Sequence, residues 1–163
     1  ALGLRPDLIS VGKALGGGIP VGAALLSERV SEAVSAGDHG STYGGNLLGT
    51  RAAAFFLTQL MEGGLLEHVR TVGMHLERRL RAIALKYPAI TEVRGAGLMR
   101  GIQLNTDATP IVDAAREEGL LVNRTDEKVV RLLPPLTIET AEIDRAAAML
   151  DAVFARVSQE VQV

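Results

Sequence analysis

The chain has 163 residues, of which 47% are apolar, and its 17 Lys and Arg against 19 Asp and Glu give a net charge of −2. This size and composition are typical of one globular domain or two small ones, and they disfavour intrinsic disorder and a nucleic-acid partner. The absence of cysteine and the scattered positions of the three histidines predict no disulfide framework and no metal site. No basic and apolar leader opens the sequence and no apolar run is long enough to span a membrane, so we expect a cytoplasmic protein without a membrane partner.

The first elements expected are two short strands and a short helix. Apolar runs at residues 8–11 and 21–26 have the composition of strands. Ser27 stands where it can cap a short helix that ends at Gly37, and a polar, glycine-rich loop follows.

Two further helices are predicted next. Asn46 stands where it can cap one that runs to about Met61, and Gly63-Gly64 separates it from a longer one that stops at Tyr87-Pro88. In the longer helix, apolar residues recur at steps of three and four: Leu65, Val69, Val72, Leu76, Leu80 and Ile83.

Beyond Pro88 the pattern changes to short strands with two helices among them. We expect strands at residues 90–93, 98–104, 120–122 and 129–133, and helices near residues 110–118 and from 140 to 157. The alternation favours an α/β or α+β architecture, with a second, α+β unit whose last helix covers a small sheet.

Lys13 directly follows the first predicted strand and precedes a triple glycine at residues 16–18. Enzymes of the α/β class place chemistry at the carboxyl end of a strand. An amine attacks a carbonyl only when it is unprotonated, and burial beside apolar neighbours with an unhindered backbone would favour that state. The alternative is that Lys13 ends an edge strand and the glycines form a turn. A P-loop is excluded because Ala14 stands where Ser or Thr is needed, and the glycine spacing at residues 95–101 misses the dinucleotide fingerprint.

The loop at residues 37–46 combines two hydroxyls, Ser41 and Thr42, with several glycines and the start of a helix. Such a loop predicts an anion-binding site made of hydroxyls and backbone NH groups. The alternative is a glycine-rich connector with an ordinary Asn cap. A Ser-His-Asp triad is disfavoured because Asp38, His39 and Ser41 are nearly contiguous instead of converging from separate elements.

Arg131 lies in the middle of an apolar strand, where side-chain alternation places it on the face opposite Val130 and Leu132. It must find a carboxylate, from the protein or from a ligand, because an unpaired buried guanidinium is costly. A structural ion pair and recognition of a ligand are both open at this point.

Together these three segments resemble the class III (ornithine-type) pyridoxal-phosphate (PLP) aminotransferases of fold type I. The resemblance extends over about residues 7–157, and residues 119–123 and 131–138 are most similar to the branch that acts on N-acetylornithine. It implies transfer of an amino group from N-acetylornithine, or a related ω-amino donor, to 2-oxoglutarate in arginine biosynthesis, with PLP as cofactor. Enzymes acting on ornithine, succinylornithine or 4-aminobutyrate share these motifs and stay as alternatives.

The resemblance also implies roles for four residues. Lys13 would bond to the cofactor and, once freed, move a proton between the substrate α-carbon and the cofactor. Thr42 would bind the cofactor phosphate, reaching across the interface of a homodimer, and Ser41 would contact the acyl-ornithine substrate. Arg131 would recognise the carboxylates of amino-acid and 2-oxo-acid substrates, or pair with an acidic residue that gates them.

The same resemblance implies that most of the large domain of this fold is missing. We expect a fragment with a remnant of the PLP-binding domain at residues 1–62, a long connecting helix at residues 63–87, and a small α+β domain at residues 88–163. The alternative function is that of a non-catalytic chain that self-associates through its uncovered strands.

Overall fold

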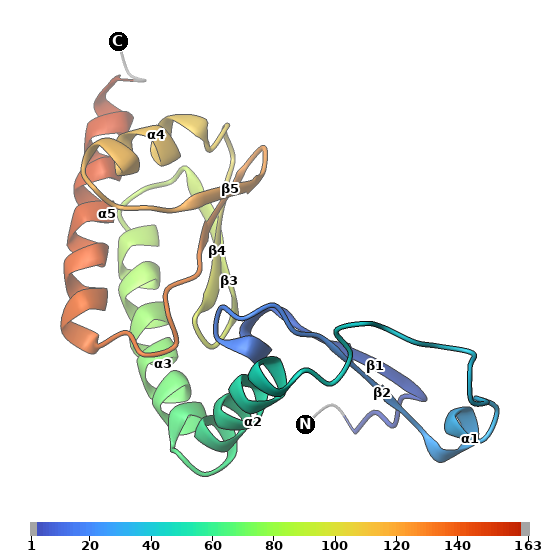
Figure 1. Cartoon of the computed structure of the whole chain (residues 1–163). Coiled ribbons are helices and arrows are strands. Elements are labelled where there is room, and N and C mark those ends of the chain that lie inside the picture. The colour runs from blue at the N-terminus through green and yellow to red at the C-terminus, as the bar shows by residue number, and fades with distance from the viewer. Residues whose placement is uncertain (1–2, 161–163) are drawn as a thin grey trace. The chain divides into compact units, whose positions relative to one another are not determined.

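The structure is a computed structural model that describes residues 3–160 (Figure 1). Its residues form two compact units, Ala1–Gly64 and Leu65–Val163. The predicted mixture of strands and helices is confirmed in both units.

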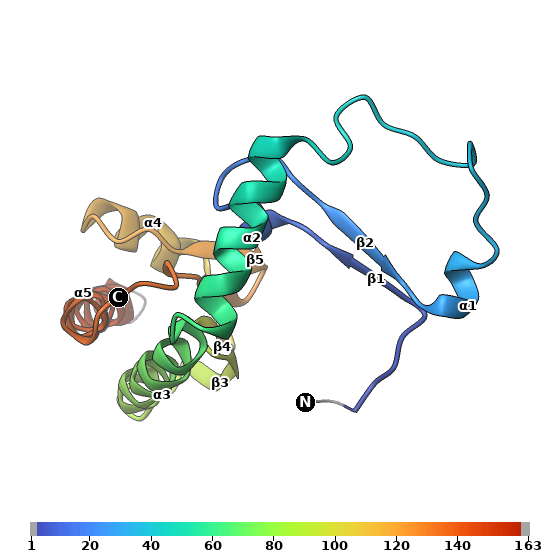
Figure 2. The same ribbon diagram turned by 60° about the horizontal axis from the view of Figure 1, so that its bottom comes forward.

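The first unit is built on two paired strands. Strands β1 (Leu8–Val11) and β2 (Ala23–Leu26) are antiparallel, with Leu8 opposite Leu26. A 3₁₀ turn, η1 (Lys13–Gly16), follows β1 after a single residue, Gly12. Figure 2 shows the two strands side by side, with helix α1 at their far end and the following loop leading in an arc to helix α2. The two strands expected from the apolar runs are therefore present.

Helix α1 is shorter than the sequence predicts. It spans Glu28–Ser31 and does not continue to Gly37. The expected cap at Ser27 is also wrong, because its hydroxyl donates to the Asp7 carboxylate at 2.8 Å and does not bond to the helix backbone. The Ser27 side chain therefore links the start of α1 to the residue before β1 instead of capping the helix.

Helix α2 (Leu47–Met61) begins and ends where the sequence predicts. The side chain of Asn46 accepts a hydrogen bond from the Gly49 backbone NH at 2.7 Å, which satisfies one of the free donors at the helix start. The glycine pair at residues 63–64 separates it from the next helix, with Gly64 at a positive φ of 74°.

The second unit packs three helices against an antiparallel sheet. The helices are α3 (Leu65–Ala84), α4 (Thr109–Glu117) and α5 (Thr140–Glu160). The strands are β3 (Ile90–Ala96), β4 (Met99–Leu104), β5 (Asn123–Asp126) and β6 (Val129–Leu132), in the spatial order β3-β4-β6-β5. Helices α3 and α5 lie side by side, and α4 also packs on α5 (Figure 1).

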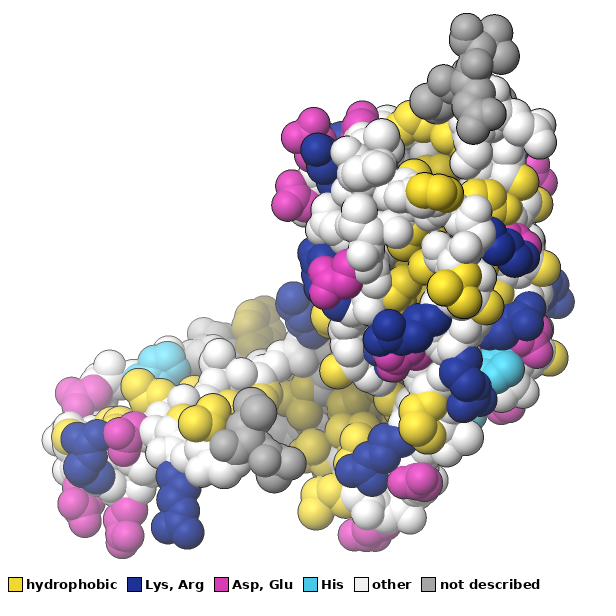
Figure 3. Space-filling model, turned by 180° about the vertical axis from the view of Figure 1, so that it is seen from behind, with side chains coloured by type: hydrophobic (Ala, Val, Ile, Leu, Met, Phe, Trp, Pro, Cys, Tyr) yellow, Lys and Arg dark blue, Asp and Glu magenta, His cyan; other side chains and the backbone are white. Residues whose placement is uncertain are grey.

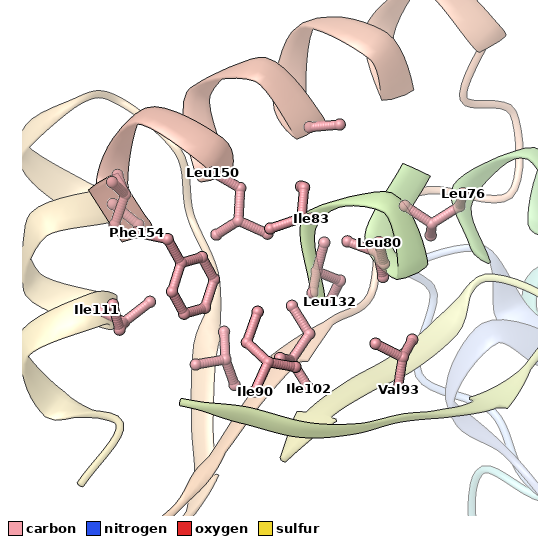
Figure 4. Close-up of a cluster of buried hydrophobic side chains, with 14 of the residues drawn as sticks. Leu76, Leu80, Ile83, Ile90, Val93, Ile102, Ile111, Leu132, Leu150 and Phe154 are labelled. Carbon is pink, nitrogen blue, oxygen red and sulfur yellow. The ribbon is translucent and has the colours of Figure 1, made fainter. Parts of the chain in front are cut away.

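The core of this unit lies between the helices and one face of the sheet. Figure 4 shows Leu80 and Ile83 of α3 meeting Leu150 and Phe154 of α5 above the sheet residue Ile102. The apolar residues of α3 that recur at steps of three and four form its buried face, which confirms the helical periodicity.

The strand predicted at residues 120–122 is wrong, because the strand starts at Asn123. Helix α4 ends at Glu117, Gly119 follows at a positive φ of 81°, and the next backbone NH, of Leu120, bonds to the Ala115 carbonyl at 2.8 Å. The backbone there terminates a helix, although Leu120 and Val122 still pack against the core.

Candidate functional site

Lys13 occupies the junction between a strand and a turn. Strand β1 ends at Val11, and Lys13 opens η1 with a φ of 53°. Among residues 3–160 it is the one non-glycine residue with a positive φ. This left-handed conformation costs an L-residue roughly 1–2 kcal/mol, and such conformations cluster at functional sites.

The turn that carries Lys13 is held by tight packing. Leu15 and Gly16 are buried, and α2 packs against η1. A Cβ at Gly16 would lie 2.6 Å from Cγ1 of Val21, so a larger side chain does not fit there. Gly17 follows in the left-handed region at a φ of 58°. The glycines after Lys13 thus serve close packing and a turn, as the structural interpretation of this segment supposed.

The Lys13 side chain itself is exposed in this chain. The expectation that apolar neighbours bury it is therefore wrong, because residues 8–11 and 23–26 on the adjoining strands are exposed as well. Among residues 3–160, no side-chain hydrogen bond or ion pair engages its amine. The amine is accessible to a ligand.

Ser41 and Thr42 lie in the exposed loop that leads into α2. The loop turns sharply here: the Gly44 NH bonds to the Ser41 carbonyl at 3.1 Å, and the Asn46 NH bonds to the Tyr43 carbonyl at 3.2 Å. In the described part of the chain, both hydroxyls lack a hydrogen-bond partner. Because α2 packs on η1, this loop and the Lys13 turn are joined through one helix of the first unit.

Arg131 lies on strand β6 of the second unit, and the predicted alternation is confirmed. Val130 and Leu132 are buried on the core face, whereas Arg131 is half-buried on the other face. Its Nη2 lies 3.5 Å from Oδ1 of Asn123, and its Nε is buried without a hydrogen-bond partner. Within residues 3–160, no carboxylate forms an ion pair with it.

One polar network near β1 was missed in the sequence. The Asp7 carboxylate accepts hydrogen bonds from Arg29 and from Ser27, and these bonds, Arg29 first, lower the pKa of Asp7. The network ties the start of β1 to α1. The signal was present, since Asp7 immediately precedes the first strand and Arg29 lies three residues after the second, but it is recognisable only once the strands are paired.

The residues present fit a PLP cofactor. An accessible, unpaired primary amine can bond covalently to an aldehyde, and an unpaired hydroxyl can donate a hydrogen bond to a phosphate. Lys13 carries such an amine and Thr42 carries such a hydroxyl. Among the described residues, no acidic side chain pairs with either group.

A comparison with known families decides the assignment. The model of the family "Aminotransferase class-III" matches residues 1–154. The chain belongs to the class III aminotransferase family. The resemblance inferred from the lysine, loop and arginine segments is therefore confirmed.

Curated relatives of this class III chain are named acetylornithine aminotransferase. Acetylornithine aminotransferase of Methanothermobacter thermautotrophicus is 45% identical over 152 residues, which cover 93% of this chain and 39% of the relative. The enzyme of the same name from Aquifex aeolicus is 42% identical, over 90% of this chain and 37% of the relative. The chain thus spans about two fifths of the length of the curated relatives it matches.

Solved structures confirm the fold. Ornithine aminotransferase from Toxoplasma gondii superposes with a TM-score of 0.89 at 31% identity, over 97% of this chain and 39% of that one. Acetylornithine aminotransferase from Elizabethkingia anophelis gives 0.85 at 31% identity, over 94% of this chain and 40% of that one. A second structure of the Toxoplasma gondii enzyme is described with partial occupancy of PLP at its active site. PLP, the cofactor expected from the sequence, is the cofactor of this family.

Over residues 3–160, every helix is too short or too polar to cross a membrane.

Proposed function

We propose that this chain provides the cofactor lysine of an aminotransferase that moves an amino group from N-acetylornithine to 2-oxoglutarate, in arginine biosynthesis. The observation that carries the proposal is Lys13, an accessible amine in a strained turn at the end of β1, within a class III family match. Acetylornithine aminotransferases at 36–45% identity support this donor. Ornithine, succinylornithine and 4-aminobutyrate stay as alternative donors.

The residues of the chain divide the work between two ends of the cofactor. PLP supplies an aldehyde that bonds to amines and a ring that withdraws electrons from the adjoining carbon. Lys13 would bind the aldehyde group of the cofactor. Once released, its amine would take the proton from the substrate carbon that bears the amino group and return it to the cofactor. Thr42 holds the phosphate by donating its hydroxyl, and Ser41 contacts the substrate in the same loop.

Arg131 provides the contact for a substrate carboxylate. A guanidinium binds a carboxylate through two parallel hydrogen bonds, and this requires donors that the protein has not already used. Arg131 has no carboxylate paired to it in residues 3–160, and its Nη1 has no hydrogen-bond partner there, which supports recognition of a ligand over a structural ion pair.

We further propose that the active form is a homodimer in the cytoplasm. In this arrangement Thr42 reaches the cofactor of the neighbouring subunit. The exposed apolar residues of β1, β2 and α2 support an association of this kind.

Covalent trapping tests the role of Lys13. The sequence has three lysines, Lys13, Lys86 and Lys128, so each is tested separately. Protein mixed with PLP and reduced with borohydride is expected to carry the label on Lys13, by mass spectrometry of its peptides. Lys13→Ala removes the label, whereas Lys86→Ala and Lys128→Ala keep it. A label on Lys86 or Lys128, or none at all, contradicts the proposal.

A second candidate is a non-catalytic chain that only self-associates. The exposure of all eight residues of β1 and β2 favours it, because the outer edge of each strand in this two-stranded sheet is free to pair with another chain. The trapping experiment separates the two: a chain of this second kind would show no selective label at Lys13.

A further inference from the structure

A cavity of about 650 Å³ lies in the second unit, where the start of α4 and the last two turns of α5 meet the segment before β3. Figure 4 shows two of the residues that line it, Ile111 of α4 and Phe154 of α5. Its volume is within the range of about 300–1,000 Å³ that is usual for small-molecule sites. None of the four residues with a role in the proposed function lines it, so its occupant is a separate question.

The cavity is lined mainly by apolar side chains. Leu104, Ile111 and Phe154 form its floor, and each has 5% or less of its surface exposed. Pro88 and Pro110 are exposed and stand at its rim. Such a surface offers few hydrogen bonds to water, so an apolar molecule that replaces water here gains free energy.

Short side chains keep the space open. Ala155 and Ser158 line the cavity from α5, and because they are three residues apart they lie on the same face of that helix. Ala89 lines it from the segment before β3. Longer side chains at these positions would occupy the volume that a ligand needs.

Two aromatic rings add to the apolar wall. The rings of Tyr87 and Phe154 stack with their centroids 5.5 Å apart. The Tyr87 hydroxyl donates to the carboxylate of Asp151 at 2.9 Å and to its backbone carbonyl at 3.0 Å. Tyr87 therefore offers its ring to the cavity while its polar end is already bonded, and an apolar ring is the ligand shape that suits such a wall.

The charged groups of the cavity are already paired. Lys86 forms an ion pair with Asp151, and Asp107 forms one with Arg124 at 2.9 Å. Hydrogen bonding from the Thr109 backbone NH lowers the pKa of Asp107, so this carboxylate is ionised at neutral pH. A ligand with a net charge would enter an apolar space without a free counter-charge, which costs free energy.

One polar group is left for a ligand to bond. The Thr106 hydroxyl lines the cavity, and it has no hydrogen-bond partner among residues 3–160. A hydroxyl can both donate and accept, so it suits either kind of polar group on a ligand.

We propose that this cavity is a second ligand site, which takes a small, uncharged ring compound bearing one hydrogen-bonding group. The ring contacts the floor formed by Leu104, Ile111 and Phe154, and the polar group bonds to the Thr106 hydroxyl. The site uses residues of the second unit alone and does not depend on the role of Lys13.

Titration of the full chain with indole tests this proposal. Indole is an uncharged ring compound with one NH donor. Followed by NMR, it is expected to shift the backbone NH signals of Ala89 and Phe154. Indole-3-acetate carries the same ring with a carboxylate, and it should bind about fivefold more weakly because the cavity offers no free cation. Thr106→Val, which keeps the shape of the side chain and removes the hydroxyl, should weaken indole binding about threefold.

Two variants that fill the cavity provide the decisive comparison. Ala155→Leu and Ser158→Leu should each weaken indole binding about tenfold or more, and either one carries the test if the other does not fold. The matched control is Ala152→Leu, the same change at an exposed position of α5 that does not line the cavity. It should leave indole binding unchanged. An absence of shifts in the parent protein, or equal affinities in the folded cavity variants and Ala152→Leu, overturns the proposed site. Indole-3-acetate binding as tightly as indole overturns the assignment of an uncharged ligand.

Discussion

Arg100 is a buried cation, with only 5% of its surface exposed. Its guanidinium donates to the carbonyls of Gly97, Gly95 and Gly73 at 2.9, 3.0 and 3.2 Å. Its charge is balanced by Glu77, whose carboxylate lies 2.9 Å from Nη1. A buried charge is tolerated only when it is paired and hydrogen-bonded, and Arg100 meets both conditions.

The Glu77 carboxylate makes stability depend on pH. Hydrogen bonding from Arg81, followed by the charge of Arg100, lowers the pKa of Glu77 below its ordinary value of 4.5. A carboxyl group with a lowered folded-state pKa contributes its full stabilisation above its unfolded pKa, and this contribution is lost as pH falls through the folded pKa. We therefore expect the free energy of unfolding to fall with pH below about 4.5, and Glu77→Gln to reduce this slope.

Urea unfolding at a series of pH values from about 3 to 7 measures this slope. The matched control is Glu67→Gln, which removes an exposed carboxylate from the same helix. It should leave the acid slope close to that of the parent protein. Identical slopes in Glu77→Gln and the parent would show that Glu77 does not carry the effect.

Candidate site residues could be picked out from the sequence where a charged side chain stands among apolar residues or glycines. Arg131 stood out as a cation in an apolar strand, and its outward face is confirmed. Lys13 stood out before three glycines, but its exposure and left-handed backbone depend on how η1 packs against α2. The cavity of the second unit gave no signal, because the segments that line it are far apart in the sequence and meet only in the folded chain.

At the scale of elements, helix α3 and the β3–β4 hairpin meet at two glycines. A Cβ at Gly73 of α3 would lie 2.7 Å from the carbonyl oxygen of Gly97, in the hairpin turn. Real side chains do not tolerate so short a distance to backbone, so Gly73 lets the helix and the hairpin approach. Arg100 then bonds to the carbonyls of both segments.

Gly73→Ala tests this contact through the sign of its effect on the free energy of unfolding. In the interior of a helix, alanine is ordinarily more favourable than glycine by about 1 kcal/mol. A Cβ forced against the hairpin should reverse this and destabilise the protein by roughly 1–3 kcal/mol. The control is Gly101→Ala, whose Cβ would be 3.6 Å from its nearest neighbour, an ordinary contact. Chemical unfolding measures both, and a stabilised Gly73→Ala variant would refute the close approach.

Helices with an apolar periodicity or a clear cap were predicted better than short elements such as α1. The helix over residues 65–84 follows from regular apolar spacing, and the helix over residues 47–61 follows from the Asn46 cap and the glycine pair after it. The strand expected at residues 120–122 failed because its apolar residues pack against the core while their backbone terminates α4. In the second unit apolar composition identifies residues that contact the core, but the hydrogen-bond partner of each backbone group decides whether they form a strand.

At the scale of the whole molecule, the two units differ in how much apolar surface they bury. The core cluster consists of residues of the second unit. In the first unit, large apolar side chains remain exposed: Leu8, Ile9, Val11, Leu25, Leu26, Leu47, Leu48, Phe55 and Met61. Figure 3 shows hydrophobic side chains at the surface between charged ones. These side chains are the ones that a second copy of the chain or a further segment would cover.

The proposed homodimer makes this surface a testable interface. Phe55 of α2 is 61% exposed, and burying such a side chain contributes about 1.5–3 kcal/mol. Phe55→Glu should therefore weaken self-association about tenfold or more. The control is Leu85→Glu, which changes a 91% exposed leucine of the second unit. Sedimentation velocity over a range of protein concentrations should show association for the parent and for Leu85→Glu, and a shift toward monomer for Phe55→Glu. A parent protein that stays monomeric at every concentration would contradict the homodimer. Equal weakening by both variants would show that the subunit contact does not depend on Phe55.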